Sequence, residues 1–149
     1  MANKILTDLG LSPLNKFLLV YWFSLGAVIF DQILTLQSQW IPIFTGTPLV
    51  NLDGSVAGTI TFASEPIGMS ICLIATLAIL YGAYLLYNKQ KRGARIAITA
   101  NIVNVGYFMF FVAPSYNFNS VTNWFVLYLA TFIVVVGAPV YLLFPEEYN

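Results

Sequence analysis

Long, nearly uninterrupted runs of apolar residues alternate with short polar segments along this chain. Two of the runs, Ile67–Tyr87 and Ile96–Ala113, are close to the roughly 20 apolar residues that a helix needs to cross about 30 Å of hydrocarbon. A similar run precedes this pair and another follows it. The pattern predicts an all-α integral membrane protein, a four-helix transmembrane bundle with spans at about residues 13–36, 66–87, 94–113 and 123–144.

Residues that favour helix starts precede the first two predicted spans. Ser12 can act as an N-cap, and Pro13 suits the first helical position. Ser64 can cap the second span in the same way. Glu65 then lies near the positive end of the helix dipole, and Pro66 falls in the first turn. We therefore expect Ser64 to cap the second span and Glu65 to stabilise this helix start.

The longest segment between predicted spans, residues 37–65, should form an outer cap. Trp40–Phe44 is aromatic, apolar and interrupted by proline, as is typical of a stretch at the membrane interface. Asp53-Gly54 is a favoured two-residue hairpin turn, because both central positions of such a turn need positive φ. Apolar residues alternate with polar or small ones from Val56 to Phe62. These features predict a small extracytoplasmic β-hairpin between spans 1 and 2.

Small residues and a proline within two of the predicted spans should shape their packing. Ala75, Ala78 and Gly82 follow one another at spacings of three and four, which lets a neighbouring helix backbone approach closely. Gly137 and Pro139 are expected to bend the fourth span in its last third.

The composition supports a single transmembrane domain over residues 1–149. Hydrophobic residues make up 59% of the chain and charged residues only 8%, where a soluble domain usually carries about 25%. So little charge cannot cover a surface that faces water. The formal net charge is zero, so nothing suggests a nucleic-acid partner.

The distribution of positive charge predicts the orientation in the membrane. Connector 88–95 carries four of the six Lys and Arg residues, and short loops rich in these residues stay in the cytoplasm. We therefore expect an N-in, C-in protein of the cytoplasmic membrane. The same connector residues are candidates for binding lipid headgroups. These are Lys89, Lys91, Arg92 and Arg95.

Two polar residues interrupt the first predicted span. Asp31 and Gln32 lie near its far end, so we expect Asp31 roughly one turn from the outer boundary. One interpretation is that Asp31 reaches the outer interface or caps a neighbouring hydrogen bond. The other is a role in handling a proton, an ion or a substrate, since an ionisable residue within a span is costly to bury.

Two amides interrupt the third predicted span. Asn101 and Asn104 are three residues apart and therefore share one helix face. Their amides need partners, because hydrocarbon offers none. We expect interhelical hydrogen bonds to Thr76, to Thr131 or to another subunit; the alternative is a polar patch that lines a pathway.

The chain lacks the residues of the usual catalytic and metal sites. It contains no histidine, which excludes a His-ligated haem, a His-bearing copper or zinc site, and a Ser/His or Cys/His pair within this chain. Its single cysteine, Cys72, lies in an apolar run, and no Gly-rich phosphate-binding motif is present. We predict no catalytic, cofactor-binding or metal-binding residues.

These observations leave two classes of function. The first is a non-catalytic accessory subunit that packs against other integral membrane subunits and against lipids. The alternative is a small oligomeric transporter or channel that uses Asp31 as an ion- or proton-coupling residue.

The four-span layout and the Asn101/Asn104 pattern resemble the small histidine-free helical subunits of membrane oxidoreductases, such as the accessory subunits of archaeal ammonia monooxygenase. The resemblance implies a role in scaffolding a copper-dependent enzyme. The copper ligands would then lie on other chains, and no residue of this chain takes a functional role from the resemblance.

Overall fold

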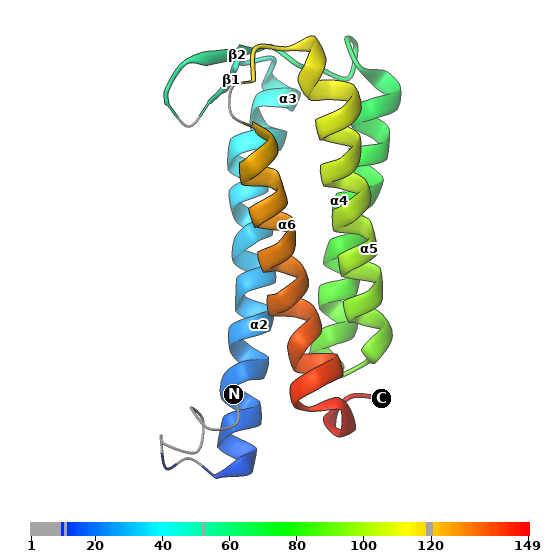
Figure 1. Cartoon of the computed structure of the whole chain (residues 1–149). Helices are drawn as coiled ribbons and strands as arrows, with labels where there is room; N and C mark the ends of the chain where they lie inside the picture. Colours follow the sequence, from blue (N-terminus) through cyan, green and yellow to red (C-terminus); the bar gives the residue numbers. More distant parts are fainter. Residues whose placement is uncertain (1–9, 11, 52, 119–120) are drawn as a thin grey trace.

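Four long helices run side by side in the computed structural model, with a small sheet at one end (Figure 1). The structure describes residues 10, 12–51, 53–118 and 121–149, and only the backbone of residues 121–124. Each of the four helices is long and apolar enough to cross a membrane. The predicted helical fold with four candidate membrane spans is confirmed.

Each long helix consists of a regular α-helix, and three of the four continue into shorter helical turns. The regular parts are α2 (Pro13–Thr35), α4 (Pro66–Tyr87), α5 (Lys91–Tyr107) and α6 (Val121–Ala138). The continuations are a π-turn (Leu36–Trp40) and α3 (Ile41–Thr45) after α2, a π-turn (Phe108–Val112) and a 3₁₀ turn (Ala113–Ser115) after α5, and a π-turn (Pro139–Leu143) after α6. A last 3₁₀ turn covers Pro145–Glu147.

The predicted helix starts are right for α2 and partly right for α4. The Ser12 hydroxyl accepts a hydrogen bond from the Asn15 backbone N–H at 3.3 Å, as an N-cap does. Glu65, not Ser64, is the N-cap residue of α4, and its side chain makes no capping bond. Ser64 instead exchanges hydrogen bonds with Thr61 in a local turn. Short hydroxyl side chains favour such turns, which compete with capping.

The first helix is longer than the sequence predicts. It continues past residue 36 to Thr45, so residues 37–45 are helical instead of part of the outer loop. Proline lacks an N–H, and its ring presses on the carbonyl four residues earlier. The wider π-turn Leu36–Trp40 lies just before Pro42, and such a turn accommodates proline without ending the helix. Gly46, at φ 71°, provides the left-handed cap that ends it.

The predicted hairpin is present, with a different turn. Strands β1 (Leu49–Val50) and β2 (Val56–Gly58) pair antiparallel. The Asn51 N–H donates to the Ser55 carbonyl at 2.8 Å, so the loop holds three residues instead of two. The Gly54 N–H donates to the Asn51 carbonyl at 3.0 Å, and Gly54 alone of the described loop residues has positive φ, 84°. A β-turn followed by a left-handed glycine is the common three-residue solution.

The buried apolar side chains form two clusters along the bundle. The cluster next to the hairpin contains Trp40, Ile43, Leu49, Ala57, Ile60, Met69, Cys72, Phe108 and Val112. The other contains Phe17, Tyr21, Leu25, Val28, Ile79, Ala83, Leu86, Ala94, Ala97, Ala100, Phe132, Val136, Val140 and Tyr148. The sheet therefore covers one end of the helical core. Strand β2 stops at Gly58, although the alternation of apolar and polar residues predicted a strand as far as Phe62.

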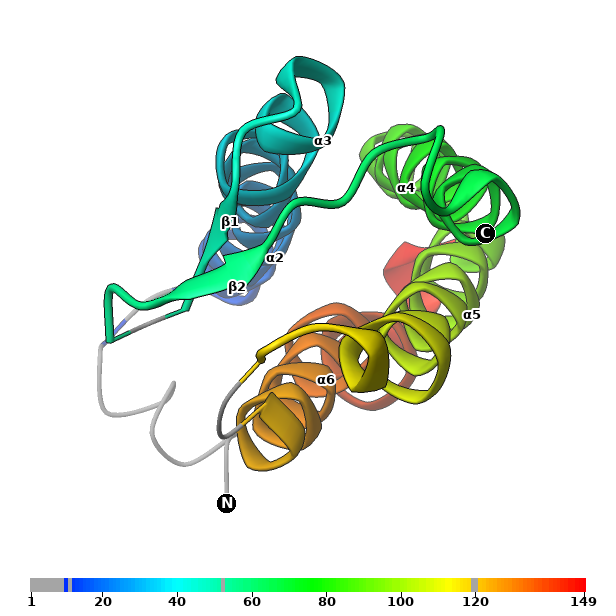
Figure 2. The same ribbon diagram turned by 90° about the horizontal axis from the view of Figure 1, so that it is seen from above.

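Helices α4 and α5 pack against each other most closely. A Cβ atom added to Gly82 would lie 2.8 Å from the Ala97 Cβ and from the Gly93 carbonyl oxygen, and one added to Gly93 would lie 2.6 Å from the Gly82 oxygen. The predicted close backbone approach at Gly82 is thus confirmed. Seen along the helices, α4, α5 and α6 follow one another in an arc, and α2 lies across from them (Figure 2).

The C-terminal residues close the turn between α4 and α5. The Asn149 N–H donates to the Lys89 carbonyl at 2.8 Å, and the Asn149 carbonyl accepts from the Lys91 N–H at 2.6 Å. Tyr148 is 4% exposed and stands edge-on to the Phe17 ring of α2, with the ring centroids 5.9 Å apart. The Lys89 ammonium lies 5.0 Å from the centroid of the same ring. These contacts join three chain segments at one end of the bundle.

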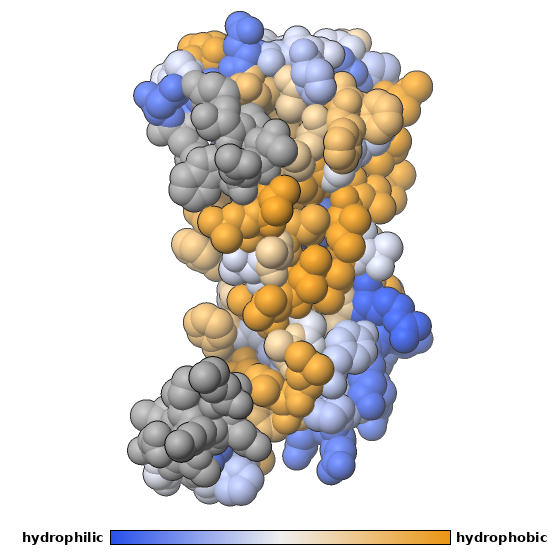
Figure 3. Space-filling view, viewed as in Figure 1, coloured by the Kyte–Doolittle hydropathy of each residue, from blue (hydrophilic) through white to orange (hydrophobic). Residues whose placement is uncertain are grey.

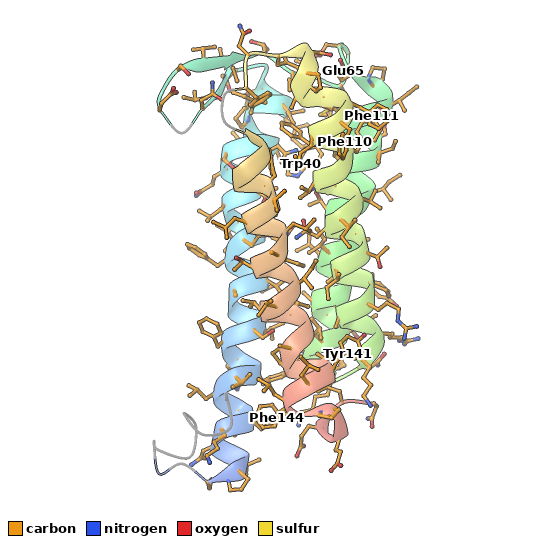
Figure 4. All side chains as sticks on the ribbon, viewed as in Figure 1. Trp40, Glu65, Phe110, Phe111, Tyr141 and Phe144 are labelled. Carbon is orange, nitrogen blue, oxygen red and sulfur yellow. The ribbon has the colours of Figure 1, made fainter. Side chains whose placement is uncertain are left out.

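The two ends of the bundle differ in charge. We call residues 88–95, 144–149 and the start of α2 the basic end, and residues 46–65 the hairpin end. The described basic end holds Lys16, Lys89, Lys91, Arg92, Arg95, Glu146 and Glu147. The charged residues described at the hairpin end are Asp53 and Glu65, the latter labelled in Figure 4. Between the ends, the face shown in Figure 3 is predominantly apolar. Lys4 and Asp8 lie outside the described residues.

Candidate functional site

Asp31 lies deeper in the bundle than the sequence predicts. The helix that carries it continues to Thr45, so Asp31 falls near the middle of a 33-residue helix, not one turn from its end. At 1.5 Å per residue, Asp31 is about 22 Å along the axis from Lys16 and about 14 Å from Trp40. If a hydrocarbon layer about 30 Å thick covered the helix between Lys16 and Trp40, both separations would put this carboxyl well inside it.

The Asp31 carboxyl makes two side-chain hydrogen bonds within the bundle. Its Oδ2 accepts from the Tyr128 hydroxyl of α6 at 3.0 Å and from the Gln32 Nε2 at 2.8 Å. Gln32 is 8% exposed, so the adjacent residue turns its amide inward. The carboxyl is therefore partly buried, and both of its side-chain partners lie within the bundle.

Asn101 extends this cluster to a third helix. Its side chain is fully buried, and its Oδ1 lies 3.4 Å from the Tyr128 hydroxyl. Tyr128 therefore stands between a carboxyl from α2 and an amide from α5. We call Asp31, Gln32, Asn101 and Tyr128 the polar cluster.

The predicted threonine partners of the asparagines are wrong. The Thr76 hydroxyl instead accepts from the Trp40 Nε1–H at 3.2 Å and donates to the Cys72 carbonyl at 2.9 Å. The Thr131 hydroxyl donates to the Leu127 carbonyl of its own helix at 2.8 Å. The helix rotations that place Tyr128 beside Asn101 leave Thr131 on the exposed face of α6.

Three buried polar atoms in and beside the cluster have no hydrogen-bond partner in the structure. They are Gln32 Oε1, Asn101 Nδ2 and Asn104 Oδ1. Asn104 is one helical turn from Asn101, on the face that the sequence predicts. Native interiors satisfy nearly all buried polar groups, so three unsatisfied atoms in and beside one cluster need an explanation.

Two further bonds between the described helices end on backbone carbonyls. The Ser24 hydroxyl of α2 donates to the Val135 carbonyl at 2.8 Å, and the Tyr21 hydroxyl donates to the Tyr87 carbonyl at 2.7 Å. These bonds hold helices together, and neither Ser24 nor Tyr21 has an unsatisfied buried side-chain atom. The polar cluster, in contrast, contains such atoms.

Tyr128 is the member of the polar cluster that the sequence did not predict. Tyrosines in spans are usually counted with the aromatic belts at the membrane surfaces. Yet a tyrosine in the middle of a span must place its hydroxyl against a polar group. That requirement was the available signal for Tyr128.

The basic residues of the connector do not converge on one point. Lys89 lies over the Phe17 ring, and the Arg92 Nε donates to Gln90 Oε1 at 2.7 Å. Lys91 is half-buried, whereas Arg95 is exposed. These contacts leave a spread of positive charge at a surface, which suits many lipid headgroups better than one bound ligand.

In the part of the chain that the structure describes, no group of three or more His, Cys, Asp and Glu side chains could hold a metal ion. No protein-family model, curated protein or solved structure matches the chain.

Proposed function

We propose that this chain is a non-catalytic subunit of a larger integral membrane complex, located in the cytoplasmic membrane. The observation that supports this most directly is Gly26, which lies on the exposed face of α2 and whose Cβ position has nothing within 4 Å. Glycine costs about 1 kcal/mol relative to alanine inside a helix, and this one serves no contact with the described part of the chain. Small residues between larger ones are what close packing against another membrane helix requires.

The surroundings of Gly26 fit that role. Phe23 is 69% exposed and Phe30 is 61% exposed, one turn before and one turn after it. The two exposed rings lie on either side of the glycine along α2, and we place the contact with a helix of another subunit there. The resemblance to oxidoreductase accessory subunits suggests a monooxygenase or a related membrane oxidoreductase as the complex.

The proposal is tested by the mass of the native particle extracted from its own cells in mild detergent. We expect the chain to migrate with larger, different subunits, and a Gly26→Leu variant to be released from them. Ala130→Leu, a matched small-to-large change on the exposed face of α6, should stay bound. A wild-type particle that contains only this chain would refute the proposal.

A second candidate function, a small oligomeric transporter or channel, is favoured by the position of Asp31 among unsatisfied amides. An ionisable residue at that depth commonly couples to an ion or a proton. In reconstituted vesicles, Asp31→Asn should then abolish a cation or proton flux that the wild-type protein supports. The absence of any flux with the wild-type protein would leave the subunit role as the sole candidate.

A further inference from the structure

The polar cluster contains more acceptors than protons to donate to them. The Tyr128 hydroxyl has one hydrogen, yet it faces Asp31 Oδ2 at 3.0 Å and Asn101 Oδ1 at 3.4 Å. The shorter distance and the charge on the carboxylate both place that hydrogen toward Asp31. The Tyr128 oxygen and the Asn101 oxygen would then face each other with lone pairs alone.

Turning the Asn101 amide by half a revolution resolves this conflict. The two ends of an amide have nearly the same shape, so hydrogen bonding decides which way it points. In the turned orientation the Nδ2, which is otherwise unsatisfied, donates to the Tyr128 oxygen. The consequence is that the Asn101 oxygen becomes unsatisfied in its place, beside the unsatisfied Gln32 and Asn104 oxygens.

The amide oxygens of Gln32, Asn101 and Asn104 then all lack a hydrogen bond in the structure, and Gln32 is the direct neighbour of the Asp31 carboxylate. The described Lys and Arg residues lie at the basic end, and the nearest along the helices is Arg95, about 9 Å before Asn101 on the α5 axis. Of the titratable groups on the packed helices, Tyr128 of α6 faces Asp31; Cys72 of α4 belongs to the apolar cluster next to the hairpin. An ionised Asp31 therefore lacks a counter-charge at this depth.

We propose that Asp31, Gln32, Asn101 and Tyr128 form an intramembrane site for one small monovalent cation, a proton or Na⁺. The cation neutralises the Asp31 carboxylate and is the positive partner that the oxygens lack. Hard cations take such oxygen ligands, and Asn104 lies one turn away as a further one. The site is independent of the proposed subunit role, because cation binding is measured without any partner chain.

Labelling of Asp31 by a hydrophobic carbodiimide tests the site. This reagent adds only to a protonated carboxyl group in apolar surroundings, where it forms a stable acylurea. We would treat the full-length wild-type protein in detergent and locate the adduct by peptide mass spectrometry. Labelling of Asp31 should fall as the pH rises, by about tenfold per pH unit once the ionised form predominates.

The effect of added Na⁺ separates the two cations. For a Na⁺ site, NaCl should protect Asp31 at constant pH, whereas choline chloride at the same ionic strength should not. For a proton site, the pH dependence should remain and both salts should act alike. Either pattern supports the proposal and names the cation.

Variants separate the site from the general stability of the bundle. Asn101→Leu and Tyr128→Phe each remove a ligand. Each should change the H⁺ or Na⁺ concentration that gives half of the maximal effect on Asp31 labelling by at least about threefold. Ser24→Ala removes a hydrogen bond between the same helices, α2 and α6, without touching the cluster. The pH and Na⁺ dependence of Asp31 labelling in this variant should therefore match that of the wild type.

Three results would overturn the proposal. One is no adduct on Asp31 at any pH at which the protein stays folded. A second is an adduct that neither pH nor Na⁺ changes, as expected for a permanently neutral carboxyl that binds water only. The third is an unaltered dependence in Asn101→Leu and Tyr128→Phe proteins that remain folded by circular dichroism.

Discussion

A buried hydrogen bond between Trp40 and Thr76 is a clear test of polar packing at the residue scale. Trp40 is 2% exposed, and the Thr76 hydroxyl is the partner of its indole N–H. Replacing Thr76 by Val keeps the side-chain shape but leaves that N–H unsatisfied. We expect the free energy of unfolding to fall by about 1–3 kcal/mol, measured by denaturant titration in detergent.

Thr131→Val provides the control for Thr76→Val. Both threonine hydroxyls donate to the carbonyl four residues earlier, but Thr131 is exposed and accepts no bond from another helix. Its replacement should change stability by less than about 0.5 kcal/mol. Equal effects of the two variants would show that the indole bond contributes nothing.

The second residue-scale prediction concerns Tyr148 at the basic end. Burial, together with the neighbouring Tyr21, raises the pKa of Tyr148 to about 12. The unfolded chain releases the same proton near pH 10, so above that pH the unfolded state binds fewer protons than the folded state. The contribution of the protonated Tyr148 side chain to the free energy of unfolding is therefore complete below pH 10 and is lost as the pH rises toward 12.

Thermal unfolding of the wild-type and Tyr148→Phe proteins between neutral pH and pH 12 tests whether stability falls as Tyr148 ionises. We expect similar melting temperatures at neutral pH and a fall above pH 10 that is steeper for the wild type by a few °C. Parallel curves would mean that Tyr148 ionises equally easily in both states.

The sequence identified some members of the polar cluster but not how they meet. Asp31, Gln32 and Asn101 stood out because polar side chains are expensive within a span. Tyr128 did not, because an aromatic side chain is expected within an apolar run. Which polar groups meet depends on the rotation of each helix, and the nearly uniform apolar runs do not encode it.

At the scale of the elements, the contact between α4 and α5 depends on two glycines. Gly93→Ala would place a Cβ 2.6 Å from the Gly82 carbonyl oxygen and 2.7 Å from the Leu86 nitrogen, both backbone atoms that cannot move aside cheaply. We expect a loss of about 1–3 kcal/mol, seen as a lower melting temperature in detergent.

Gly106→Ala is the matched change on the same helix, α5. Its Cβ position has nothing within 4 Å, so the added methyl group meets no obstacle. The gain in helix propensity, up to about 1 kcal/mol, should leave this protein as stable as the wild type or slightly more stable. A destabilised Gly106→Ala together with a neutral Gly93→Ala would contradict the packing described here.

Proline explains both the accurate and the inaccurate element boundaries. Pro13 and Pro66 occupy first helical positions, so these starts were predictable to the residue. Pro42 was expected to interrupt an interfacial stretch, yet the helix passes through it by way of a π-turn. Whether proline ends a helix or only widens it depends on packing around the turn, which the local sequence does not contain.

At the scale of the whole molecule, the separation of charge is the feature that should set the orientation in the membrane. Five described Lys and Arg residues and two Glu residues lie at the basic end, whereas the charged residues described at the hairpin end are acidic. Since Lys and Arg resist translocation, we expect the basic end to face the cytoplasm and the hairpin to face outward.

Cysteine labelling tests this orientation with little disturbance of the bundle. Cys72 is fully buried, so the wild-type protein should give a low background with a membrane-impermeant maleimide. Ala63→Cys adds an exposed thiol at the hairpin end and Glu146→Cys adds one at the basic end. In intact cells Ala63→Cys should react, and Glu146→Cys should react only after the membrane is permeabilised. The reverse pattern would mean that a partner, and not the Lys and Arg residues of this chain, determines the topology.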